Sequence, residues 1–139
     1  MRLVVDASVA IKWVIPDPLI EPDADKAVAI LRAIRARMIE AVEPPHWLAE
    51  ILSVIARARP QRGTLTLGIL AMLPFKEATS LDCYRRAADI SIALNHHLFD
   101  TLYHAVALEE GATLVTADEA YYAKAKDLGA IVPLADFSI

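Results

Sequence analysis

Two short apolar runs in this chain each lead towards an aspartate. Residues 2–5, rich in β-branched side chains, predict a buried strand that ends at Asp6, and residues 112–116 predict a second strand just before Asp118. In parallel α/β sheets, ligands bind beyond the carboxyl ends of the strands. If these two strands are neighbours, both carboxylates lie on one rim of the sheet.

Two further carboxylates are expected on helices. Asp100 stands where a helix is predicted to begin, and Glu50 lies in the first half of another. Glu50 belongs to a stripe that otherwise turns inward, where an acid needs a partner or a metal ion. Taken singly, each acid is explained equally well as a helix N-cap or as a solvated helix residue.

Together the four acids Asp6, Glu50, Asp100 and Asp118 predict a metal site. Carboxylates that share a cavity repel one another unless a cation compensates, so without metal at least one of them should have a raised pKa. Mg²⁺ prefers hard oxygen ligands and keeps several waters. Two such ions can orient a water and stabilise a leaving oxygen on phosphate, which makes phosphodiester chemistry the expected activity.

The elements that must position these acids alternate between strands and helices, which favours one layered α/β domain, residues 1–139, with a largely parallel sheet. The alternation follows from hydrophobic periodicity and from Gly and Pro breaks. Strands are predicted at 2–5, 41–43, 76–80, 112–116 and from 131, and helices at 8–14, 22–38, 48–58, 64–73, 82–95, 100–110 and 119–128.

Single residues predict several helix ends. Pro22 suits the first turn of the 22–38 helix, because a missing N–H does no harm there. Met38 closes the apolar stripe of that helix. Asp82 and Asp100 are good N-caps, and Gly111 stands where glycine commonly ends a helix.

The composition fits an intracellular protein. Hydrophobic residues make up 56% of the chain, and the single cysteine, Cys83, excludes an internal disulfide, which suits the reducing cytoplasm. The longest mostly apolar run, 65–75, is too short to span a bilayer, so no membrane association is expected. The net charge of −4 argues against nucleic-acid binding, but subtracting four metal-binding acids gives −4 + 4 = 0.

Basic residues near the Glu50 helix are candidates for phosphate contacts. Arg57, Arg59 and Arg62 cluster near its end, and Lys12 adds a further positive charge. Such contacts position a nucleic-acid backbone without reading its sequence. Ordinary solvated helix faces explain the same residues.

Three histidines surround Asp100 in sequence. His104, one helical turn later, is either a donor to Asp100 or a core histidine bonded elsewhere, and we favour the core. His96 and His97 are expected in a connection. His97, Asp100 and His104 together would suit a transition metal, so the roles of His97 and His104 stay open.

Four segments, in order and in separation, resemble the motifs of PIN-domain nucleases of the VapC toxin type. Each is weak alone, but together they span the chain from Val4 to about Ile131. They are residues 5–8 (VDAS), 45–50 (PHWLAE), 100–103 (DTLY) and 114–119 (LVTADE).

The resemblance implies a three-layer α/β/α domain that cleaves RNA with Mg²⁺ or Mn²⁺, pairs with a protein antitoxin and forms a homodimer. It assigns catalysis and metal binding to Asp6, Glu50, Asp100 and Asp118. Ser8 and Thr116 match positions where a hydroxyl supports the site, in keeping with the role of outer hydrogen bonds in orienting metal ligands.

Two other functions stay open at this point. A phosphatase of the haloacid-dehalogenase class has a similar sheet, but it needs a second aspartate two residues after the first, where this chain has Ser8. A PIN-like binding module without catalysis is the other alternative, although such modules have lost acids that are all present here.

Overall fold

Five parallel strands form the centre of the molecule. The fold is taken from a computed structural model, which describes residues 1–15, 19 and 21–139. Every described strand pairing is parallel. From edge to edge the strands are β3 (Phe75–Glu77), β2 (Glu40–Glu43), β1 (Arg2–Val5), β4 (Thr113–Thr116) and β5 (Ile131–Pro133).

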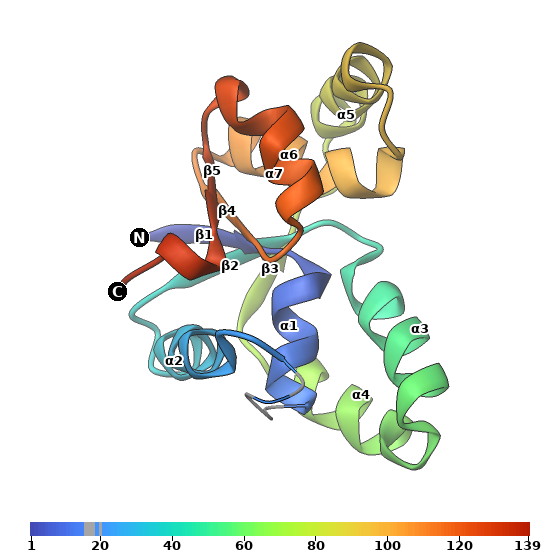
Figure 1. The fold of residues 1–139 in the computed structure, drawn as a ribbon, viewed down its shortest axis with the longest axis vertical. Helices are drawn as coiled ribbons and strands as arrows, with labels where there is room; N and C mark the ends of the chain where they lie inside the picture. Colours follow the sequence, from blue (N-terminus) through green and yellow to red (C-terminus); the bar gives the residue numbers. More distant parts are fainter. Residues whose placement is uncertain (16–18, 20) are drawn as a thin grey trace.

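Helices cover both faces of this sheet. Figure 1 shows α1 to α4 on one side and α5 to α7 on the other, which confirms the predicted α/β/α class. No helix in the described part of the chain is both long enough and apolar enough to cross a bilayer. The helices are α1 (Ala7–Val14), α2 (Ala24–Arg35), α3 (Trp47–Ala58), α4 (Gly63–Ala71), α5 (Leu81–Leu94), α6 (Leu98–Glu110) and α7 (Glu119–Ala125).

The central strand explains why two acids meet. Leu3, Val4 and Val5 of β1 are buried, as expected for a strand covered on both faces. Val5 pairs with Val115 of β4, so the two strands end side by side. Asp6 and Asp118, which follow these strands, therefore lie at the same rim.

The α2 helix is shorter at both ends than its apolar pattern predicts. Pro22 precedes the helix, and Met38, expected inside, is 67% exposed. The chain leaves the helix after Arg35 because it must turn into β2 at Glu40. Arg37 takes a left-handed conformation in this turn, at φ 57°.

Two predicted N-caps are wrong and one glycine end is right. Ser80 caps α5 by accepting a hydrogen bond from the Cys83 N–H at 3.3 Å, while Asp82 pairs instead with Arg85. Asp100 is the third residue of α6 rather than its cap. Gly111 ends α6 at φ 62°, the conformation that favours glycine.

Candidate metal centre

Asp6 and Asp118 lie at the carboxyl ends of adjacent strands. The Asp6 N–H donates to the Val115 carbonyl at 3.1 Å, which extends the β1–β4 pairing by one residue. Asp118 caps α7 by accepting from the Tyr121 N–H at 2.9 Å. The sheet and the start of α7 thus hold both carboxylates at the rim.

The hydroxyls of Ser8 and Thr116 brace Asp6. Each donates to the same oxygen, Asp6 Oδ2, at 2.6 Å. Ser8 Oγ also accepts from the Ala117 N–H, and Thr116 Oγ1 from the Asp118 N–H, both at 3.0 Å. The two hydroxyls therefore orient Asp6 and tie the ends of β1 and β4 together.

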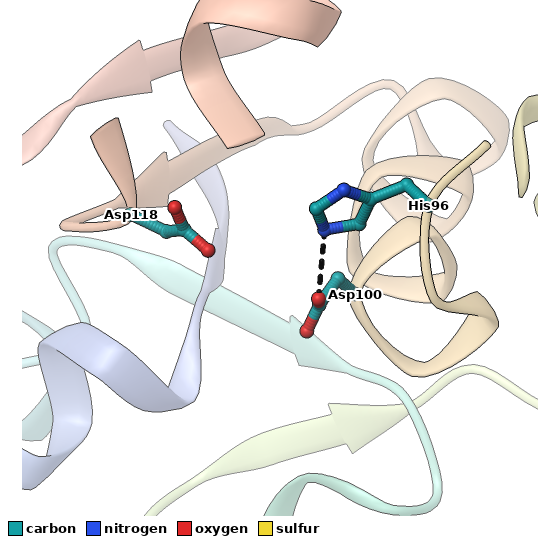
Figure 2. Close-up of side chains that lie close together, drawn as sticks. All are labelled: His96, Asp100 and Asp118. Atoms are coloured by element: carbon teal, nitrogen blue, oxygen red, sulfur yellow. Dashed lines mark hydrogen bonds and ion pairs between the residues drawn. The ribbon is translucent and has the colours of Figure 1, made fainter. Parts of the chain in front are cut away.

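Asp100 approaches Asp118 from α6, on the other side of the rim. Figure 2 shows the Asp118 carboxylate facing His96 and Asp100. One atom from each of these three side chains lies within 4.8 Å of the other two. Among the described residues, this is the one group of three or more His, Cys, Asp or Glu side chains close enough to share an ion.

His96 holds Asp100 in place. Its Nε2 lies 2.9 Å from Asp100 Oδ2, and its Nδ1 lies 3.2 Å from the Lys124 ammonium. An ammonium only donates, so Nδ1 accepts and the Nε2–H donates to Asp100. In this arrangement His96 orients the carboxylate instead of offering it a competing lone pair.

Glu50 is held from the side by the Tyr103 hydroxyl, and the His46 ring lies beside it. The Tyr103 hydroxyl donates to Glu50 Oε2 at 2.5 Å, and His46 Nε2 lies 3.5 Å from the same oxygen. The His46 and Tyr103 rings are in contact, with centroids 4.8 Å apart. Neither contact with Glu50 follows from the sequence pattern, although Tyr103 lies three residues after Asp100 on the same helix face.

Burial and neighbouring charges raise the pKa of two of the acids. Burial is the larger cause for both Asp6 and Glu50. The charges of Asp100 and Asp118 add to the rise at Asp6, and those of Asp6 and Asp100 add to it at Glu50. The predicted direction is confirmed, but loss of water outweighs the like-charge repulsion expected from sequence.

The charges of the four acids influence one another, but the four carboxylates are not equally close together. Asp100 and Asp118 are close enough to share an ion, whereas Asp6 and Glu50 lie outside that closest group. Ligands on opposite sides of one Mg²⁺ lie about 4.2 Å apart, twice the usual ligand distance of about 2.1 Å. A spread of up to 4.8 Å therefore needs only small movements, and the oxygen-rich donor set fits Mg²⁺ or Mn²⁺.

The histidine beside Asp100 is neither of the two proposed as ligands. His104 is fully buried, with Nδ1 3.0 Å from the Tyr121 hydroxyl and Nε2 2.7 Å from the Gly129 carbonyl. Burial lowers its pKa. The core interpretation of His104 is right, and a site made of His97, Asp100 and His104 is wrong. The sequence carried no periodic signal for His96, because it precedes α6 and its contact with Asp100 depends on how the chain enters that helix.

Most of the basic candidates are engaged with protein atoms. Lys12 is buried and pairs with Glu21 at 2.7 Å, so it is unsuited to RNA phosphate. Arg62 donates to the Val14 carbonyl at 3.1 Å. Arg57 and Arg59 donate to backbone carbonyls of α3, at Ser53 and Ala58; Arg57 is exposed and Arg59 is half-buried.

A fifth acid, Glu43, lies beneath the rim. It is fully buried at the end of β2, and its Oε1 accepts from the Val5 N–H at 2.9 Å. Oε2 has no hydrogen-bond partner among the described residues. Burial raises its pKa well above the ordinary value. Glu43 and Trp47, whose ring N–H donates to the Val5 carbonyl, together fix the residue before Asp6.

The fold and this rim define a parallel α/β domain with an acidic site at its strand ends. Residues 3–127 match the PIN domain family, and the chain belongs to that family. PIN domains are generally nucleases. No curated protein sequence matches the chain.

Solved structures share the fold at low sequence identity. VapBC2 from Rickettsia felis, bound to a DNA fragment from its promoter, matches with a TM-score of 0.66 and 17% identity, over 96% of this chain and 97% of its own. A toxin–antitoxin complex from Klebsiella pneumoniae matches with a TM-score of 0.65 and 15% identity, over 99% of both chains. A Pyrobaculum aerophilum protein matches with a TM-score of 0.66 and 15% identity, over 97% of this chain and 90% of its own.

Proposed function

We propose that the protein is a metal-dependent endoribonuclease and the toxin of a type II toxin–antitoxin pair. The observation that carries the proposal is the rim itself. Asp100 and Asp118 lie at ion-sharing distance, next to an Asp6 that two hydroxyls orient. Membership of the PIN family supports nuclease chemistry at this rim.

The side chains divide the work of such a site between binding and orientation. When bound by Asp6, Glu50, Asp100 and Asp118, Mg²⁺ or Mn²⁺ would supply an activated water and stabilise the leaving oxygen on phosphorus. Supporting contacts keep the ligands pointed at a common centre. They come from Ser8 and Thr116 to Asp6, from His96 to Asp100 and from Tyr103 to Glu50. No side chain is required as a covalent nucleophile.

The alternatives fit the same geometry less well. A phosphatase of the haloacid-dehalogenase class needs an acid where Ser8 stands, and the Ser8 hydroxyl is already committed to Asp6 Oδ2 and the Ala117 N–H. A binding module without catalysis has no need for four acids, two of them with raised pKa values. Both observations favour the nuclease.

The purified protein is expected to cleave a mixed pool of single-stranded and structured RNA with Mg²⁺ or Mn²⁺. Ca²⁺ should support cleavage poorly, because it takes more ligands in looser geometry and misplaces the water. Gel analysis of RNA fragments with each ion and with EDTA measures this. Undiminished cleavage in EDTA would exclude the metal-dependent mechanism.

We also propose a protein antitoxin as partner, a homodimeric state and a cytoplasmic location. Two of the similar structures are toxin–antitoxin assemblies, and an unguarded ribonuclease harms its host. The acidic rim suits an inhibitor that inserts an Arg or Lys among the carboxylates. The guanidinium fork of arginine can bridge two carboxylates at once.

Expression of the protein in a strain without the adjacent antitoxin gene is expected to arrest growth. The Asp100→Asn variant, expressed to the same level, should be harmless because its site cannot hold metal correctly. Growth curves with matched protein levels on immunoblots give the comparison. Harmless expression of the parent protein would count heavily against the toxin assignment.

A further inference from the structure

We propose that an open pocket beside His96 binds a backbone phosphate of the RNA, next to the phosphate held at the acidic rim, and that Lys124 is its main cation. The inference rests on the proposed ribonuclease function and adds a substrate contact to it. The pocket has a volume of about 660 Å³ and is lined by Ser91, Ile92, Asn95, His96, His97 and Lys124.

The position of the pocket links it to the metal centre. Its walls come from the end of α5, the connection into α6 and the exposed side of α7. His96 belongs both to this lining and to the group with Asp100 and Asp118. In Figure 2 the His96 ring points from that connection towards the two aspartates. When one phosphate of an RNA strand is held at the rim, the next phosphate along the strand therefore lies beside the pocket.

The lining offers hydrogen-bond donors and contains no carboxylate. Lys124 is exposed and directs one N–H towards His96 Nδ1, which leaves two ammonium donors for another acceptor. His97 and Asn95 are exposed polar side chains beside it. The Ser91 hydroxyl already donates to the His96 carbonyl at 2.5 Å and braces the wall. This donor set suits an anion.

The charge of the chain explains why such a contact matters. The protein is acidic overall, and its rim repels a polyanion until metal is bound. Lys12 is buried in an ion pair, and Arg86, across α5, pairs with Glu109. Lys124 therefore provides an exposed cation in direct contact with a residue of the site. Because the pocket is open to solvent, it suits a phosphate within an RNA backbone better than a free phosphate ion, which would need an enclosed site.

Salt-dependent RNA binding tests the pocket. Fluorescence anisotropy with a labelled single-stranded RNA, in Ca²⁺ to limit cleavage, gives the affinity at several salt concentrations. Each phosphate contact to a single strand contributes about 0.7 to the slope of log K against log salt. Lys124→Ala should lower that slope by about 0.7 and weaken binding several-fold, and Lys124→Arg should retain both.

A matched control is Lys126→Ala, which removes an exposed lysine two residues away and outside the pocket lining. It should leave the slope unchanged. The inference is overturned if the parent binds and cleaves RNA while Lys124→Ala keeps the parent slope. If the parent neither binds nor cleaves RNA, the proposed function fails, and this inference fails with it.

Competition with inorganic phosphate shows whether the pocket binds an RNA backbone phosphate or a free phosphate ion. At equal ionic strength, phosphate should displace RNA from the parent no better than chloride does. Strong displacement by phosphate that disappears in Lys124→Ala would assign the pocket to a free phosphate ion and overturn the RNA contact. Thermal melting of each variant should match the parent, because the substituted lysines are exposed.

Discussion

Asp100→Asn is expected to lower RNA cleavage at saturating Mg²⁺ or Mn²⁺ by at least about 100-fold. Loss of an outer hydrogen bond to a metal ligand costs about 10–100-fold, and loss of a ligand charge should cost at least the upper end of that range. A factor of 100 corresponds to about 2.7 kcal/mol in the barrier. Single-turnover kinetics at several metal concentrations measures the loss.

The same substitution should leave the metal-free fold intact. Asparagine keeps an oxygen that can accept from the His96 Nε2–H, and it removes one negative charge from the coupled acids. In EDTA the variant should melt at or above the parent temperature. With Mn²⁺ it should gain less, because the stabilisation by a bound ligand rises with the logarithm of its affinity for the folded state.

Two further variants sharpen this test. Asp118→Asn should behave like Asp100→Asn, since asparagine is also a good N-cap for α7. Asp127→Asn, at an exposed position away from the rim, should change neither cleavage nor the response to Mn²⁺. A large loss of melting temperature in EDTA for both rim variants would show that Asp100 and Asp118 are structural, and the site assignment would have to be withdrawn.

Glu43→Gln is expected to stabilise the metal-free protein at neutral and alkaline pH. Desolvation raises the pKa of the buried Glu43 carboxyl. The hydrogen bond that this carboxyl accepts from the Val5 N–H lowers the pKa by a smaller amount. Glutamine keeps an oxygen for that N–H and carries no charge to bury. Burying a charged carboxylate costs more free energy than burying a neutral amide of the same shape, so we expect a higher free energy of unfolding for Glu43→Gln above the folded pKa of Glu43.

The pH dependence follows from the direction of the shift. Between the unfolded and folded pKa values of Glu43, the folded protein binds more protons than the unfolded chain. Stability therefore falls as pH rises through this window, and the full penalty is present above the folded pKa. Glu43→Gln should flatten this fall, leaving the smaller contributions of Asp6 and Glu50, whose pKa values are also raised.

Urea unfolding in EDTA, at pH values roughly one unit apart from about 4 to about 9, measures the free energy of unfolding as a function of pH. Glu77→Gln is the control, because Glu77 is exposed on the neighbouring strand β3. It should leave the profile unchanged. An equal fall with pH in Glu43→Gln and in the parent would mean that Glu43 is not the buried group responsible.

Local pattern was sufficient for the two strands that precede Asp6 and Asp118. The apolar runs before Asp6 and Asp118 predict strands because both faces of a central parallel strand are buried, and chain order makes them parallel. Gly111 was predictable for a similarly local reason, since its left-handed backbone favours glycine. Ser8 and Thr116 lie next to these strand ends, so their nearness to Asp6 also follows from sequence.

Tertiary structure alone decided the partners that come from other elements. Glu43 ends an unremarkable strand in sequence, and its burial follows from the packing of helices over both faces of the sheet. Tyr103 reaches Glu50 across 53 residues, and Lys124 reaches His96 across 28. Periodicity shows which side of an element turns inward, but which side chains meet there depends on how two elements pack. For that reason the sequence alone predicted the four acids and the two hydroxyls beside Asp6, and only the fold identified the residues that orient Asp100 and Glu50.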